Sequence, residues 1–249
     1  MPGYYNVNGE IYPSVTTILQ KMLPEPYTLK RWKLKNPNWE DIVKYKQVMG
    51  SIVHYRILNK LSTRILELPS GVSIYNIPYE VDHIFDIADT IWDNFGFDIG
   101  HPRTIETIRV DPIEKYVGTP DIIAPFDGIR TLADIKTSKD IYDTHKLQVG
   151  GYYNMMRNNG VPEEDLPTRA MLISVHPYEE GNPTLEGHTV VLSKKQLEDQ
   201  AEKFVNLVRK YHRVFSVKRR GNVTRYLTTP GRQLIESIDE KDVDIKCKE

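Results

Sequence analysis

The sequence predicts an α/β protein: a mixed β-sheet flanked by helices, with an added helical region in front of it. Apolar residues first recur at helical spacing, and after about residue 100 the period changes to the alternation typical of strands. Helices and strands then alternate along the chain, which favours one sheet covered by helices. At 249 residues the chain is long enough for one domain with a substantial core.

We expect this single domain over residues 1–215, with the helical region at 12–100 and the α/β core at 101–215. Residues 216–249 are first basic and then acidic and show no strong periodicity. This composition predicts a charged tail without strand partners.

Four helices are predicted in the N-terminal region. Ser14 caps a short first helix that Pro24 ends, and residues 27–35 form a second, basic helix. The longest candidate covers residues 38–61, and a fourth covers 80–95. Both carry an apolar stripe at helical spacing.

The core begins with three predicted strands at residues 103–110, 115–124 and 129–137, which alternate or are rich in β-branched residues. Asp127-Gly128 is a hairpin-turn signal between the last two. The remaining elements are a helix over 143–159, strands over 169–175 and 188–192, and a helix that Ser193 caps and that reaches about Val214.

Composition excludes several function classes. Hydrophobic residues make up 39% and charged residues 27% of the chain, and no apolar run approaches the length of a membrane span. The polar N-terminus lacks a signal-peptide pattern, so a cytoplasmic protein is expected, in the host cytoplasm if the gene is viral. A single cysteine, Cys247, excludes an internal disulfide and a zinc or iron–sulfur site built on cysteines.

Two acids and a lysine are predicted to converge on the hairpin. Asp134 and Lys136 share one strand face, and a turn at Asp127-Gly128 sets Asp121 roughly opposite Asp134. Adjacent carboxylates repel unless a cation lies between them, and such oxygen ligands suit Mg²⁺ or Mn²⁺. Metal-assisted phosphodiester cleavage needs this equipment, and the alternative is a salt-bridge ladder on the surface.

The short acid-x-Lys pattern alone identifies no site. It recurs at Asp239-Glu240-Lys241 and Asp244-Ile245-Lys246, and 34 acids and 19 lysines predict about three matches by chance. Both further matches fall in the charged tail. Glu106 supports the match at Lys136, because it shares a predicted strand face with apolar neighbours, where an acid needs a metal or, as the alternative, an arginine partner.

In this order the motifs resemble those of the PD-(D/E)xK nuclease superfamily, specifically its RecB-like branch, which includes phage and CRISPR-associated exonucleases. The similarity covers roughly residues 12–192. Its elements are Gly50-x-x-x-His54, Glu106, Gly118-Thr119-Pro120-Asp121, Asp134-Ile135-Lys136-Thr137-Ser138 and Gln148-x-x-x-Tyr152, with an opening segment at 13–19. The resemblance implies a restriction-endonuclease-like core.

The resemblance also implies roles for these residues. One or two Mg²⁺ or Mn²⁺ ions would be held by His54, Glu106 (directly or through water), Asp121, Asp134 and the carbonyl of Ile135. Lys136 would activate or orient the attacking water, and Gln148 and Tyr152 would position the nucleophile, the lysine or a phosphate. Judged by spacing alone, His54 is an ordinary helix residue and the Gln148/Tyr152 pair is routine helix packing. Iron–sulfur members of the branch need several flanking cysteines, so no cluster is expected.

Basic residues beside aromatic ones are the candidates for binding nucleic acid. They are Lys30, Arg31 and Lys33 around Trp32, and Arg209, Lys210, Arg213, Arg219 and Arg220 in the last helix and the start of the tail. A solvated helix face is the alternative for both clusters, and no motif for reading base sequence is present.

We therefore expect a divalent-metal-dependent nuclease acting on DNA, with no membrane partner. By analogy with the branch, it is an exonuclease or end-processing enzyme of recombination, repair or viral DNA metabolism. Two alternatives stay open: a structure-selective endonuclease on the same fold, and a catalytically silent nucleic-acid-binding protein.

Overall fold

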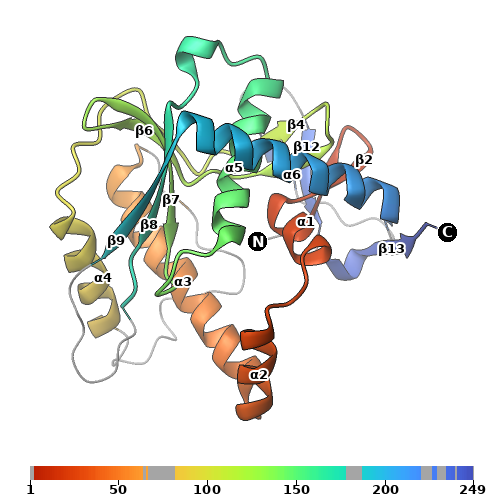
Figure 1. The fold of residues 1–249 in the computed structure, drawn as a ribbon, viewed down its shortest axis with the longest axis horizontal. Helices are drawn as coiled ribbons and strands as arrows, with labels where there is room; N and C mark the ends of the chain where they lie inside the picture. The colour runs from red at the N-terminus through yellow and green to blue at the C-terminus, as the bar shows by residue number, and fades with distance from the viewer. Residues whose placement is uncertain are drawn as a thin grey trace.

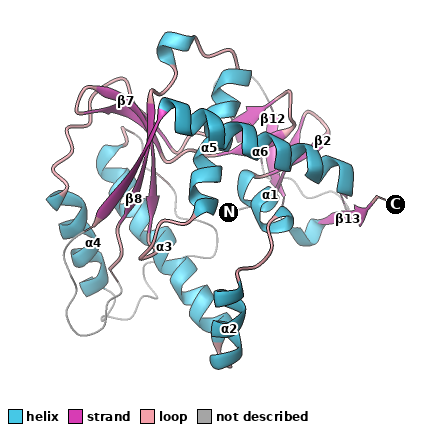
Figure 2. Cartoon of the chain, in the orientation of Figure 1, coloured by secondary structure: helices cyan, strands magenta, loops and turns pink. Residues whose placement is uncertain are grey.

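The computed structural model describes residues 3–63, 66, 82–177, 187–219, 226–228, 234–238 and 240–248. It shows an α/β protein with a mixed five-stranded sheet flanked by helices, which confirms the predicted class at this level (Figures 1 and 2). None of the helices in the described ranges combines the length and apolar character that a membrane crossing requires.

The central sheet has the strand order β3-β6-β7-β8-β9. Its strands are β3 (Thr104–Ile105), β6 (Ile122–Phe126), β7 (Ile129–Lys136), β8 (Arg169–Ser174) and β9 (His188–Ser193). The pairs β3–β6, β6–β7 and β8–β9 are antiparallel, and β7–β8 is parallel. A parallel pair needs a long crossover, which helix α5 (Asp143–Asn158) supplies.

The hairpin between β6 and β7 has the predicted register. Phe126 pairs with Ile129 across a two-residue turn, whose Asp127 and Gly128 have φ of 50° and 76°. Positive φ at both positions is the geometry of a type I′ turn, which matches the twist of the flanking strands. Ile122 pairs with Ala133, so the next step of the same register sets Asp121 opposite Asp134.

Helices cover both faces of the sheet (Figure 1). Helices α1 (Val15–Met22), α5 and α6 (Lys194–Val214) lie on one face, and α3 (Trp39–Leu61) and α4 (Asp82–Asn94) lie on the other. Alternation along β7 divides its side chains accordingly: Leu132 packs under α5 and α6, whereas Ala133 and Ile135 pack under α3 and α4. Asp134 and Lys136 therefore share the α5 face.

The predicted helices are confirmed to within one or two residues. Helix α2 (Tyr27–Lys35) has the predicted bounds and carries no buried residue. The predicted caps are also present: the Ser14 and Ser193 side chains accept the backbone N–H of Thr17 and Gln196. The first residues predicted for the fourth helix, 80 and 81, lie outside the described ranges.

Two predicted strands are each interrupted, which corrects the continuous strands expected at 103–110 and 115–124. After β3, Glu106 takes a φ of 41°, and β4 (Arg109–Asp111) pairs with β5 (Tyr116–Gly118) in a separate ribbon. Pro120 separates β5 from β6 because it offers no N–H to a sheet ladder.

The chain begins with a β-hairpin that was not predicted. Strands β1 (Tyr4–Val7) and β2 (Glu10–Pro13) pair across Asn8-Gly9, where φ is 53° and 93°. An Asn-Gly pair is a strong hairpin signal, and the polar composition of the segment concealed it.

The expected tail without strand partners is wrong for the described residues after 215. Strand β12 (Leu234–Ile238) pairs with β1 and with β11 (Tyr226–Thr228), and β10 (Phe215–Arg219) pairs with β13 (Val243–Cys247). The second Asp-Ile-Lys, at residues 244–246, lies in β13. Val243 and Ile245 alternate there with charged residues, a two-residue period that the high charge of the segment obscured.

Candidate active site

The predicted site residues gather where β7 ends, between α3 and α5. Lys136 is the last residue of β7, His54 comes from α3, and Gln148 and Tyr152 come from α5. The two helices lie on opposite faces of the sheet. The end of the strand is therefore where their side chains can meet.

Gly50 brings α3 close to the sheet. A Cβ at this position would lie 2.9 Å from Oγ1 of Thr137, the residue that follows β7. His54 lies four residues further along α3, on the same helical face. The glycine thus sets the distance of the His54 imidazole from the strand end.

Three side chains offer a metal-binding group. The ligand atoms of His54, Glu106 and Asp121 all lie within 4.8 Å of one another. His54 Nδ1 is 3.6 Å from Asp121 Oδ2. The backbone N–H of Glu106 donates to the carbonyl of Asp121 at 2.9 Å. Where the predicted strand is interrupted after β3, this hydrogen bond holds the backbones of the two acids together.

Asp134 is not part of this group. Its carboxylate is buried, and within the described structure neither oxygen accepts a hydrogen bond. Lys136 Nζ lies 2.5 Å from Oδ2, which is an ion-pair distance without hydrogen-bond alignment. A buried carboxylate in this state is costly, and a second cation nearby would offset that cost.

The donor set fits a divalent metal ion. Carboxylate oxygens with one imidazole suit Mg²⁺ or Mn²⁺, and the unsatisfied Asp134 carboxylate supplies further negative charge beside the group. The Ile135 carbonyl, predicted as a ligand by resemblance, belongs to a residue whose N–H donates to Asp121 Oδ2 at 2.7 Å. The Ile135 backbone also hydrogen-bonds His54.

A chain of hydrogen bonds holds Lys136. Its Nζ donates to Gln148 Oε1 at 3.0 Å, and Gln148 Nε2 donates to the Tyr152 hydroxyl at 2.7 Å. Gly118 makes room for the tyrosine, since a Cβ there would lie 2.7 Å from the Tyr152 ring. The pair at i and i+4 on α5 therefore orients the lysine, as expected for residues on one helical face.

Burial governs the electrostatics of the site. Burial raises the pKa of Asp121 well above its usual value, and the negative charge of Asp134 raises it further. For His54, burial and then the positive charge of Lys136 lower the pKa to about 4. The imidazole is consequently neutral near pH 7, the state in which histidine binds metal. Burial also raises the pKa of Tyr152 well above its usual value, so its hydroxyl keeps its proton.

Sequence reasoning missed two residues close to the site. Burial and the positive charge of Lys136 lower the pKa of His145 to about 4, so this histidine lies within electrostatic reach of the lysine. Its position three residues before Gln148 on α5 was the available signal. The buried Tyr5 of β1 hydrogen-bonds the side chain of Thr119, which lies two residues before Asp121 in the chain.

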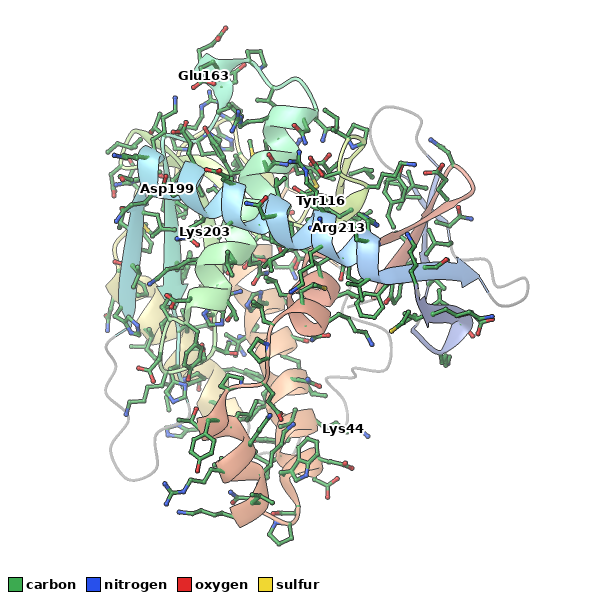
Figure 3. The ribbon with its side chains drawn as sticks, turned by 45° about the vertical axis from the view of Figure 1, so that its right-hand side comes forward. Lys44, Tyr116, Glu163, Asp199, Lys203 and Arg213 are labelled. Carbon is green, nitrogen blue, oxygen red and sulfur yellow. The ribbon has the colours of Figure 1, made fainter. Side chains whose placement is uncertain are left out.

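The predicted nucleic-acid-binding residues fall into two separate groups. Helix α2 lies at the lower end of the molecule in Figure 1, beside the start of α3, and the end of α6 lies beside β13. Lys44 of α3 and Arg213 of α6 mark these two regions in Figure 3. The exposed residues among the candidates are Lys30, Arg31, Arg209, Lys210 and Arg213, and Lys33 is half-buried.

Two of these cations are already paired. Lys33 forms an ion pair with Glu25 and lies 4.1 Å from the centre of the Trp39 ring. Arg209 binds both carboxylate oxygens of Glu114. The side chain of Arg219 and the whole of Arg220 lie outside the described structure.

Comparison with known proteins does not assign a family. No protein-family model matches the sequence, and no curated protein sequence matches it. Among solved structures, the crystal structure of SSO0001 matches 64% of this chain and 73% of its own, with 15% sequence identity and a TM-score of 0.25. A match at that TM-score supports no conclusion about fold or function.

Proposed function

We propose that this protein is a divalent-metal-dependent nuclease that hydrolyses phosphodiester bonds in DNA. The observation that carries the proposal is the convergence of His54, Glu106 and Asp121 beside a lysine held by its neighbours. The buried Asp134 carboxylate also supports it, because its described partner is the Lys136 ammonium alone and a metal ion would further offset its charge.

Each side chain has a chemical task in this proposal. A bound divalent ion would lower the pKa of a water ligand and neutralise charge on the phosphorane-like transition state. Lys136 has three N–H groups, of which one donates to Gln148, and its charge is paired with Asp134. Its remaining N–H groups are left for the attacking water or a phosphate oxygen. The neutral imidazole of His54 adds a ligand without adding charge.

The finer features of the proposal rest on analogy with the RecB-like branch. An antiparallel β3-β6-β7 meander followed by the α5 crossover to β8 supports a restriction-endonuclease-like core. The preference for exonuclease or end-processing activity has the same basis. The expected cytoplasmic location rests instead on the polar N-terminus without a signal-peptide pattern. An endonuclease on this fold and a silent nucleic-acid-binding protein are the competing functions.

Cleavage assays separate these functions. Purified protein is incubated with labelled linear and covalently closed circular DNA, single- and double-stranded, and with RNA, in Mg²⁺, in Mn²⁺ and in EDTA. Asp134→Asn and Lys136→Gln test the site. Lys146→Gln is the matched control, because Lys146 is on α5 but pairs with the exposed Asp143.

We expect metal-dependent cleavage of linear DNA that both site variants lower by about 100-fold or more and that the control retains. Cutting of the closed circle would instead identify an endonuclease. Binding without any cleavage would identify the silent protein. Cleavage that persists in EDTA, or in both site variants, would refute the proposal.

A further inference from the structure

A cavity is lined by residues on both sides of Glu106 in the chain. Its volume is about 510 Å³, within the range of roughly 300–1,000 Å³ that is usual for ligand pockets. Residues 103–105 and 107–110, from β3 to the start of β4, form one wall, and the end of α3, Asn159 and Ile235 close it. This cavity contains none of the residues placed in the active site above.

Two arginines in the cavity have unsatisfied nitrogens. Nε of Arg103 and Nε of Arg109 are buried without a hydrogen-bond partner, and within the described structure neither guanidinium forms an ion pair. The other partly buried arginines of the described residues have partners: Arg56 pairs with Asp89, Arg130 pairs with Asp165, and Arg169 donates to Thr131 Oγ1 and the Phe126 carbonyl. The two cavity arginines differ from them in this respect.

No acid offsets these two charges within the cavity. The described residues that line it include Thr104, Thr107 and His101, but neither aspartate nor glutamate. Burial lowers the pKa of Arg109. Both arginines are partly buried, and a buried Nε–H without an acceptor is costly. An anion with oxygens for the guanidinium N–H groups would offset that cost.

The cavity is tied to the active site through Glu106. This acid lies midway between Arg103 and Arg109 in the chain, and its positive φ accompanies the break at which it joins His54 and Asp121. Each arginine is three residues from Glu106, and three residues of extended chain span at most about 11 Å. Each arginine therefore lies within about three nucleotides of Glu106, measured along a DNA strand. The β4–β5 pairing also sets Arg109 against Gly118, close to Asp121 in the chain.

We propose that Arg103 and Arg109 form a phosphate-binding pocket that grips the substrate strand within a few nucleotides of the bond to be cleaved. This inference rests on the proposed nuclease function. A planar guanidinium can give two parallel N–H bonds to one phosphate, and the cavity presents two such groups. The phosphate is either an internal one of the strand or one at its end.

The test measures binding without cleavage. Fluorescence anisotropy in EDTA follows a labelled single-stranded DNA of about 12 nucleotides against full-length wild-type protein, Arg103→Gln and Arg109→Gln. Each variant is expected to weaken binding about 10-fold or more. Each should also reduce the salt slope of log K by about 0.7, the value for one lost phosphate contact to a single strand.

Arg130→Gln is the matched control, because it removes the same charge from a guanidinium that Asp165 already holds. It should leave the slope and the affinity unchanged. If the cavity variants behave like this control, the inference is refuted. Thermal melting shows whether the glutamine variants fold.

If the glutamine variants do not fold, Arg103→Lys and Arg109→Lys replace them. These should keep the slope but lose affinity, since a lysine keeps the charge without the two parallel donors. Inorganic phosphate should compete with the DNA for the wild-type protein more strongly than chloride at equal ionic strength. Lysine variants with unchanged affinity, together with no preference for phosphate, would overturn the inference.

Different oligonucleotides identify the source of the phosphate. Equal losses of affinity for linear and circular single strands would identify an internal phosphate, and losses only for 5′- or 3′-phosphorylated strands would identify a terminal one. Both results support the pocket. A wild type that binds in this arginine-dependent way but never cleaves would refute the nuclease and leave the pocket standing, whereas cleavage with arginine-independent binding would do the reverse.

Discussion

Replacing Gly50 by alanine should separate stability from function. A Cβ at Gly50 meets Thr137 Oγ1 at 2.9 Å, and ordinary contact begins at 3.4 Å, so α3 or Thr137 must shift by about 0.5 Å (3.4 − 2.9). Metal–ligand distances tolerate only about ±0.2 Å. If α3 retreats, His54 leaves ligand distance, and metal affinity should fall about 10-fold or more.

The free energy of unfolding of Gly50→Ala should rise slightly or hardly change. Alanine in place of glycine inside a helix adds about 1 kcal/mol to this free energy, which offsets the cost of the contact with one side-chain oxygen. Gly150→Ala is the comparison. Its Cβ would lie 2.5 Å from the Gln200 backbone, so α5 and α6 must separate by about 0.9 Å (3.4 − 2.5). The free energy of unfolding should therefore fall by about 3 kcal/mol or more.

Denaturant unfolding and Mn²⁺ titration of both variants measure these effects. Thr137→Ala removes the oxygen that the new Cβ meets, so the double variant Gly50→Ala/Thr137→Ala should regain the metal affinity of Thr137→Ala alone. Unchanged metal affinity in Gly50→Ala, or no recovery in the double variant, would show that Gly50 does not set the position of His54.

Three further predictions concern the site. Lys136→Gln should lower kcat for cleavage about 10²–10³-fold while KM stays within about twofold, because its ammonium is assigned to the transition state; steady-state kinetics in which only KM changes would contradict this role. Mn²⁺ at 100 times its Kd should raise the free energy of unfolding by about 2.7 kcal/mol, and an equal gain in Asp121→Asn at the same Mn²⁺ concentration would exclude that acid as a ligand. The pKa of His54 is lower in the folded than in the unfolded protein. Its contribution to the free energy of unfolding is therefore fully present above the unfolded pKa of 6.5 and is lost as the pH falls to about 4. His54→Gln should therefore lack about 3 kcal/mol of the acid-induced loss in metal-free protein, and urea unfolding from pH 7 to 4 measures it. The raised pKa of Asp121 acts in the opposite direction, since its contribution is lost as the pH rises above 3.8, so wild type and His54→Gln are compared at each pH. Identical pH profiles for the two proteins would contradict the assignment.

Local signals predicted much of the fold. Ser14 and Ser193 cap their helices as expected, and Asp127-Gly128 forms the expected turn, because caps and tight turns depend on a few adjacent residues. The same turn set the register, so the position of Asp121 opposite Asp134 was predictable, and alternation along β7 set Lys136 on the face of Asp134.

The remaining features depend on distant partners or unusual backbone. A glutamate with φ of 41° has no sequence signature, so the break at Glu106 was read as a continuous strand. The pairing of β1 with β12 joins segments that only the folded chain brings together. The approach of α3 to β7 was expected only through the resemblance, because local periodicity does not specify which helix meets a strand end.

The pairing of β1 with β12 has a consequence for protein synthesis. Tyr4 and Ile238 are partners in the sheet although 234 positions (238 − 4) separate them. At about 5–20 residues per second, a ribosome needs on the order of 10–50 s to make the strand that covers β1. Until then the hairpin of β1 and β2 has one open edge. Tyr5 of this hairpin hydrogen-bonds the side chain of Thr119, two residues before Asp121 in the chain. Strand β12 therefore pairs with β1, and so supports the candidate catalytic centre through Tyr5 and Thr119, only after nearly all residues of the chain have been made.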